Sequence, residues 1–77
     1  MESYDLAIIQ LKKVLSLNEN FIRARQLLAL LYMMTGRRDN KIRAKKLLLG
    51  IRKIDVTNTT TIRYLEELKD GKRDFRF

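Results

Sequence analysis

Apolar side chains recur at helical spacing in four segments of the chain, and polar or glycine-containing breaks separate these segments. In the first segment Ala7, Leu11 and Val14 fall at i, i+4 and i+7, the spacing that places side chains on one face of an α-helix. The same spacing returns in the other three segments. It predicts helices over about residues 4–17, 21–35, 40–54 and 59–69.

Residues suited to helix ends stand at the breaks. We expect Asn20 to cap the second helix and Asp39 the third, because a short polar side chain accepts a hydrogen bond from a backbone N–H of the first turn. Gly36 suits the position just after a helix, where the backbone becomes left-handed. Residues 55–61 are rich in Asp, Asn and Thr, which bond to their own backbone, and they predict a turn that caps the fourth helix.

The composition favours helix throughout. The chain has no proline and only three glycines, while leucine, lysine and arginine are abundant. A length of 77 residues leaves room for one small core. The expected fold class is therefore all-α: four antiparallel helices in one domain over residues 1–70, followed by a flexible basic tail over residues 71–77.

The chain also resembles itself at a fixed offset, which is the signature of stacked supersecondary units. Residues of matching type are separated by 37 positions, so that the first helix corresponds to the third and the second to the fourth. The matching pairs are Ala7 and Ala44, Leu11 and Leu48, Val14 and Ile51, Leu17 and Ile54, Leu28 and Leu65, and Leu31 and Leu68. The sequence thus predicts one helical hairpin flanked by two half-units.

This pattern resembles the tetratricopeptide repeat, a helix-turn-helix unit of about 34 residues. The likeness covers nearly the whole chain: its second segment carries Ala24, Leu28, Ala29, Tyr32 and Gly36 at positions typical of the family's first helix. The longer period and Arg25, at the family's tryptophan position, depart from the pattern. The resemblance implies a short helical-repeat scaffold that binds a peptide or protein partner in a groove lined by the first helices of each unit.

The residues that the resemblance places in this groove mix basic and apolar types: Arg23, Gln26, Leu30, Met33, Met34, Thr60, Arg63 and Glu67. Methionine adapts its shape to a ligand, and Arg23 and Arg63 could hold a carboxylate of an acidic partner, unless both are simply solvated. The family's clamp for acidic chaperone C-termini needs lysine and asparagine where this chain has Gln26, Leu27 and Leu30. That specificity is therefore not expected here.

The net charge of +8 is concentrated between Arg37 and Lys53, a stretch that contains eight basic residues and one acidic residue, Asp39. The basic patch that we single out consists of Arg37, Arg38, Lys41, Lys45, Lys46, Arg52 and Lys53. One interpretation is a solvated outer face that flanks the apolar stripe of Leu48 and Ile51. The alternative is a small nucleic-acid-binding protein of the helix-turn-helix kind, with the third helix as its recognition element.

The sequence lacks the residue types on which several other function classes depend. With no cysteine and no histidine, the common thiol nucleophiles, imidazole bases and soft metal ligands are absent, so we expect no enzyme, no metal site and no cofactor. The longest apolar run, LLALLYMM, is far shorter than the ~20 residues that span a bilayer. Without an export signal, the default expectation is a cytoplasmic protein that does not enter membranes.

The half-units at the two ends predict uncovered apolar surface on the terminal helices. The first helix lacks the neighbour that should cover Ile8, Ile9 and Leu15, and the fourth helix lacks its own second helix. Contiguous apolar patches of this kind usually mark interfaces. The sequence therefore predicts self-association through the terminal helices, and a start in the middle of a repeat favours an excised part of a longer protein.

Overall fold

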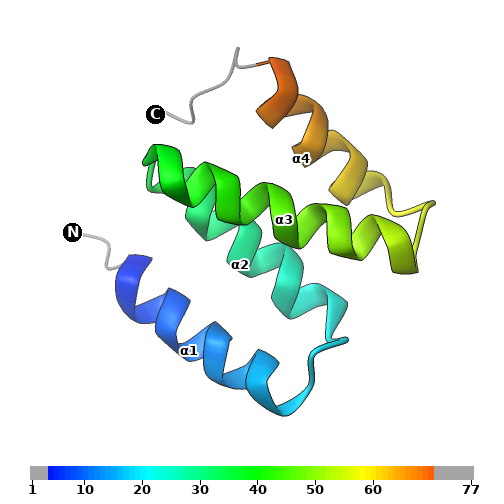
Figure 1. Cartoon of the computed structure of the whole chain (residues 1–77). Helices are drawn as coiled ribbons and strands as arrows, with labels where there is room; N and C mark the ends of the chain where they lie inside the picture. Colours follow the sequence, from blue (N-terminus) through cyan, green and yellow to red (C-terminus); the bar gives the residue numbers. More distant parts are fainter. Residues whose placement is uncertain (1–3, 71–77) are drawn as a thin grey trace.

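The computed structural model describes residues 4–70, which form four α-helices (Figure 1). These are α1 (Tyr4–Leu17), α2 (Ile22–Met34), α3 (Arg38–Ile54) and α4 (Thr59–Asp70). No strand occurs within these residues, so the all-α fold class is confirmed. Each helix end lies within two residues of the range expected from the sequence. The predicted basic tail, residues 71–77, lies outside the described residues.

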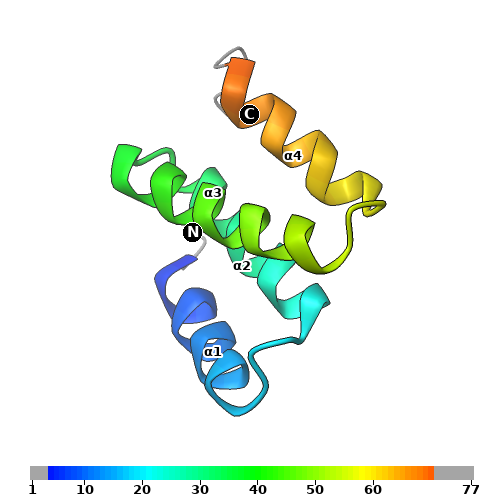
Figure 2. The same ribbon diagram turned by 45° about the vertical axis from the view of Figure 1, so that its right-hand side comes forward.

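Consecutive helices run antiparallel and pack against one another in a flat array of about 31 × 30 × 18 Å. The most extensive contact joins α2 and α3, and in Figure 1 α3 crosses in front of α2. The terminal helices α1 and α4 lie at opposite edges of this pair in both Figure 1 and Figure 2. The short connections favour the alternation, because loops of three or four residues join helices that are neighbours in space and commonly antiparallel.

The core is centred on α2, which contributes five of its buried residues: Ala24, Leu28, Ala29, Tyr32 and Met33. From the other side α3 contributes Ala44, Leu48 and Ile51, and α1 contributes Ile8. Alanines on the facing sides of α2 and α3 let the two helices approach closely. The sequence pattern placed Val14 on the same side of α1 as Ala7 and Leu11, but Val14 is exposed and does not belong to the core.

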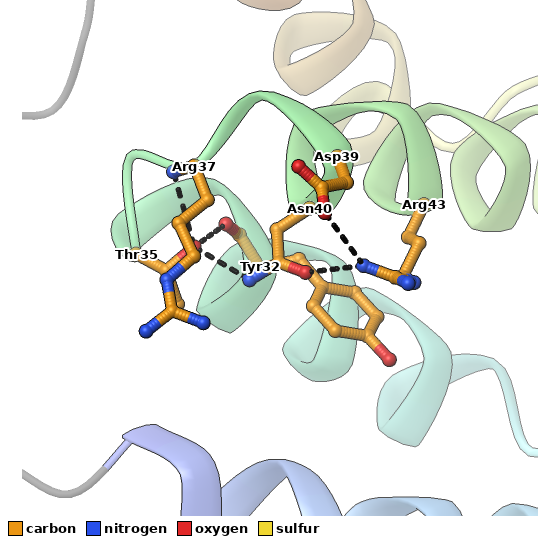
Figure 3. Close-up of polar contacts among 6 residues, drawn as sticks. All are labelled: Tyr32, Thr35, Arg37, Asp39, Asn40 and Arg43. Atoms are coloured by element: carbon orange, nitrogen blue, oxygen red, sulfur yellow. Dashed lines mark hydrogen bonds and ion pairs between the residues drawn. The ribbon is translucent and has the colours of Figure 1, made fainter.

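A polar network closes the turn between α2 and α3 (Figure 3). Gly36 has a φ of +73°, the left-handed conformation expected of the residue after a helix. Thr35 Oγ1 donates to the carbonyl of Tyr32 (2.7 Å) and accepts from Asn40 Nδ2 (2.9 Å). Asn40 is buried, and its Oδ1 accepts from Arg43 Nη1 at 2.8 Å. The chain therefore leaves α2 and enters α3 through a defined set of bonds rather than a loose loop.

Two of the expected helix caps are wrong. The N-cap position of α2 is Phe21 rather than Asn20, and that of α3 is Arg37 rather than Asp39. Neither residue makes a side-chain capping bond. α3 begins earlier because the Arg37 carbonyl already accepts from the N–H of Lys41 at 3.0 Å, which places Asp39 inside the first turn. There its negative charge still favours the helix N-terminus.

The loops after α1 and α3 repeat one another at the offset of 37 residues. α1 ends at Leu17 and α3 at Ile54, while α2 begins at Ile22 and α4 at Thr59. In the first loop Asn18 Oδ1 accepts from the backbone N–H of Asn20, and in the second Asp55 Oδ1 accepts from that of Thr57, both at 3.2 Å. The backbone bonds that enter and leave these loops match as well. In the first loop they run from Asn18 N to Val14 O, from Phe21 N to Asn18 O and from Arg25 N to Phe21 O. In the second loop the equivalent bonds run from Asp55 N to Ile51 O, from Asn58 N to Asp55 O and from Ile62 N to Asn58 O.

Candidate functional site

A side-chain network ties the start of α4 to α2. Gln26 Nε2 donates to Asn58 Oδ1 at 2.7 Å and to Thr61 Oγ1 at 3.1 Å. Asn58 Oδ1 also accepts from the backbone N–H of Thr61 at 3.0 Å, which makes Asn58 the N-cap of α4. Thr61 is almost fully buried. These bonds fix the distance between α2 and α4 and thereby shape the surface between them.

Beside this network, α2 and α4 enclose an open hollow of about 350 Å³. The residues that line it are Arg23, Gln26, Leu27, Leu30, Thr60 and Tyr64. Four of them, Arg23, Gln26, Leu30 and Thr60, belong to the groove expected from the sequence. The structure therefore brings half of that predicted set together in one place. We call this surface the α2–α4 groove.

The other four predicted groove residues do not line the hollow. Met33 is wrong as a groove residue because it is 0% exposed in the core. It follows Ala29 by four residues and shares its inward side of α2. Met34 and Glu67 are half-buried and Arg63 is exposed, and none of the three lines the hollow.

Two lining residues, Leu27 and Tyr64, were missed by the sequence interpretation. Thr60, Tyr64 and Glu67 follow one another at i, i+4 and i+7, so they share one side of α4. Arg63 fits helical spacing equally well, because it follows Thr60 by three residues and precedes Glu67 by four. Spacing alone therefore did not distinguish Tyr64, the aromatic member of the groove, from Arg63.

The lining of the groove mixes apolar, hydrogen-bonding and charged groups. Leu27, Leu30 and Tyr64 supply apolar wall, Thr60 and the amide of Gln26 supply hydrogen-bonding groups, and Arg23 adds an exposed cation. No pair of side chains in its lining combines a nucleophile with a general base. Apolar walls with a few polar groups at fixed positions are typical of sites that hold a ligand in one orientation.

The basic patch lies on the side of α3 that faces away from the core. Six of its residues are exposed, and Lys41 is half-buried. Leu48 and Ile51, the apolar stripe that these cations were expected to flank, are fully buried in the core. The apolar residues that do lie among the cations are Ile42 and Leu49, which the sequence interpretation did not place there.

The free side of α1 also differs from the expectation. Ile8 is buried and Leu15 is half-buried, since both face the core. The exposed apolar residues of this helix are Leu6, Ile9, Val14 and Leu17, and Leu17 is 90% exposed. α1 is therefore apolar on two sides, only one of which the fold covers.

None of the helices within residues 4–70 is both long and apolar enough to cross a lipid bilayer. Comparisons of the chain with models of protein families, with curated proteins and with solved structures found no match.

Proposed function

We propose that this chain is a non-catalytic protein-interaction module, a divergent tetratricopeptide-like segment that binds a peptide or protein partner in the α2–α4 groove. The observation that carries the proposal is the hollow of about 350 Å³ between these helices, with its mixed apolar and hydrogen-bonding lining. The first helices of successive repeats form the binding surface in that family, and α2 and α4 are the helices that correspond to them here.

The repeated loops support the assignment of α2 and α4 to equivalent positions. Matching helix ends and matching backbone bonds 37 residues apart mean that each unit turns from one helix to the next in the same way. Stacked units of this kind bury a continuous core and leave one side of their helices for a ligand. A partner is therefore expected along the groove rather than at an isolated pocket.

The lining indicates what the partner offers. Leu30 and Tyr64 suit an apolar side chain of a peptide, and the Arg23 guanidinium suits a carboxylate by a charge-assisted hydrogen bond. Both donors of the Gln26 amide group are already used by Asn58 and Thr61, so its carbonyl oxygen is the part that a peptide N–H could reach. An acidic and apolar peptide segment fits these groups best.

A peptide-display selection against the immobilised chain tests this function. Selected peptides should combine apolar and acidic residues, and Arg23→Glu or Leu30→Gln should each weaken their binding about tenfold or more. Lys13→Glu and Leu17→Gln provide matched controls, because both change exposed residues of α1 outside the groove. Equal affinities for the groove variants and the α1 variants, measured by fluorescence anisotropy, would exclude the groove as the site.

The second candidate function is nucleic-acid binding, which the cations on the outer side of α3 favour. For a scaffold with an incidental basic surface, we expect binding to duplex DNA or RNA that is weak, independent of sequence and strongly salt-dependent. With six or more phosphate contacts, the affinity should fall about 10³-fold between about 50 and 200 mM salt. Tight binding at high salt, or preference for one sequence, would instead favour the helix-turn-helix alternative with α3 as recognition element.

We also propose that the chain self-associates through the uncovered side of α1. Leu6, Ile9 and Leu17 are exposed there, and complete burial stabilises by about 1.5–3 kcal/mol for Leu17 (90% exposed) and by about half as much for Leu6 (56%) and Ile9 (51%). Light scattering over a concentration series should show a growing dimer fraction, and a Leu6→Lys/Leu17→Lys variant should remain monomeric. A wild-type chain that is monomeric at every concentration up to about 1 mM would contradict this proposal.

A further inference from the structure

The outer face of α3 carries an apolar row between two rows of cations. Residues seven apart on an α-helix lie nearly in line, because two turns span about 7.2 residues. Ile42 and Leu49 form the central row. The row on one side consists of Arg38, Lys45 and Arg52, and the row on the other of Lys46 and Lys53, preceded in line by Asp39, which pairs with Arg43. We call this surface the outer face of α3.

None of these side chains is needed to bury the core. α3 packs inward through Ala44, Leu48 and Ile51, whereas Ile42 and Leu49 are exposed. α2 lies behind α3 in Figure 1, and no described helix lies in front of it. The apolar row is therefore a second hydrophobic side of the helix without a partner in the fold.

The surface is hollowed at the end of the apolar row. Leu49, Arg52, Lys53 and Val56 line an open depression of about 420 Å³. Arg52 also lines a second depression of about 280 Å³, together with Ile62, Leu65, Glu66 and Lys69 of α4. The two depressions share Arg52, so the surface continues from α3 onto α4. Each has apolar residues in its lining and cations at its edge.

The cations of this face have no carboxylate partner among the described residues. Among the described side chains of residues 4–69, the single ion pair joins Arg43 and Asp39, at 4.0 Å between Nη1 and Oδ2. Arg38, Lys45, Lys46, Arg52 and Lys53 are all exposed and form no ion pair there, and the carboxylate in the lining is Glu66, which shares the second depression with Arg52. An apolar row flanked on both sides by unpaired positive charge is complementary to an apolar row flanked by negative charge.

We propose that the outer face of α3 binds an acidic amphipathic helix of a partner protein. The apolar side of that helix packs along Ile42 and Leu49, and one of its large apolar side chains enters the depression beside Val56. Its flanking glutamates or aspartates then lie next to the two rows of cations. This is the helix-on-helix geometry in which residues seven apart form the seam and charged neighbours select the partner.

A second copy of this chain does not supply such a helix. α2 contains no acidic residue, α3 contains only Asp39, and α1 carries Asp5 together with Lys12 and Lys13. The acidic residues of α4, Glu66, Glu67 and Asp70, are confined to its last five residues rather than spread in two rows along the helix. The depressions also distinguish a protein partner from a lipid surface, because they accept protruding side chains that a flat bilayer lacks. A duplex would leave the apolar row unburied.

The probe for this proposal is a synthetic helical peptide of about three heptads, with leucine at the seam positions and glutamate beside them. A scrambled peptide of the same composition carries equal charge without the apolar row. The heptad peptide should bind the full chain at least about tenfold more tightly than the scrambled one, as measured by fluorescence anisotropy. Anionic phosphatidylserine vesicles and a DNA duplex are measured in parallel.

The variants Ile42→Gln and Leu49→Gln should each weaken binding of the heptad peptide about tenfold, and Lys45→Glu/Lys46→Glu should weaken it further. Ile54→Gln is the matched control, because Ile54 (53% exposed) and Ile42 (55% exposed) lie on the same helix but on different sides of it. Circular dichroism confirms that each variant is folded. Leu30→Gln in the α2–α4 groove should leave this binding unchanged, which separates the two proposals.

Several results would overturn the proposal. These are equal binding of the scrambled peptide, an unchanged affinity of the Ile42→Gln and Leu49→Gln variants, and no binding of the heptad peptide at about 1 mM. Tighter binding of the vesicles or of the duplex than of the heptad peptide would also overturn it, and would assign the face to a membrane or to nucleic acid.

Discussion

Replacing Leu28 by alanine should lower the free energy of unfolding by about 2–5 kcal/mol, the loss found for leucines that are truncated inside packed cores. Leu28 is 3% exposed and lies on α2, the helix that packs against both α1 and α3. The substitution removes apolar contacts on two sides of the helix and leaves a cavity that neighbouring helices fill only in part. Chemical denaturation followed by circular dichroism measures the change.

Leu27→Ala is the matched control, because Leu27 is the next residue of the same helix and is 48% exposed at the groove. Its truncation should cost less than about 1 kcal/mol, since half of its surface is already in water. A loss below about 1 kcal/mol for Leu28→Ala, equal to that of the control, would mean that α2 is not the centre of the core.

The pattern of apolar residues was enough to predict the helices and their order. Ala24, Leu28 and Tyr32 recur every four residues and turn out to be buried together, because this spacing places side chains on one side of a helix. The offset of 37 residues likewise predicted which helices correspond, and the bonds of Asn18 and Asp55 show the same turn at both places. These features depend on local spacing, which a sequence displays directly.

Features that depend on how the helices sit against each other were not predictable in the same way. Met33 was expected in the groove, yet it is 0% exposed and belongs to the core cluster with Ala29, four residues before it. Asn40 is a polar residue that the structure buries in the turn between α2 and α3, and nothing in its local sequence distinguishes it from a surface asparagine.

For the same reason, only half of the predicted groove residues line the hollow. Arg23, Gln26 and Leu30 were found because the resemblance to helical repeats indicated which side of α2 lines a groove. The contribution of α4 was harder to assign, because the position of this helix depends on its packing against α3 and on bonds from Gln26 to Asn58 and Thr61, across more than 30 residues of chain. Tyr64 reaches the groove only through these long-range contacts.

The second large effect is expected at this contact. Asn58→Ala should lower the free energy of unfolding by about 2–4 kcal/mol, because one side-chain oxygen serves two partners. Oδ1 accepts from the backbone N–H of Thr61 at 3.0 Å and from Gln26 Nε2 at 2.7 Å. Without it, the first turn of α4 loses its cap, the nearly buried Thr61 keeps a donor without a partner, and α4 loses a bond to α2. Urea denaturation provides the measurement.

Asn58→Asp separates the loss of these bonds from a general intolerance of the site. A carboxylate accepts the same two bonds and interacts favourably with the positive end of α4, so this variant should keep most of the stability. Asn18→Ala removes only the bond from the backbone N–H of Asn20 in the equivalent loop, which is exposed, and should cost less than about 1 kcal/mol. If Asn58→Ala were as mild as Asn18→Ala, the contact would not hold α4 against α2, and the groove would lose the constraint that shapes it.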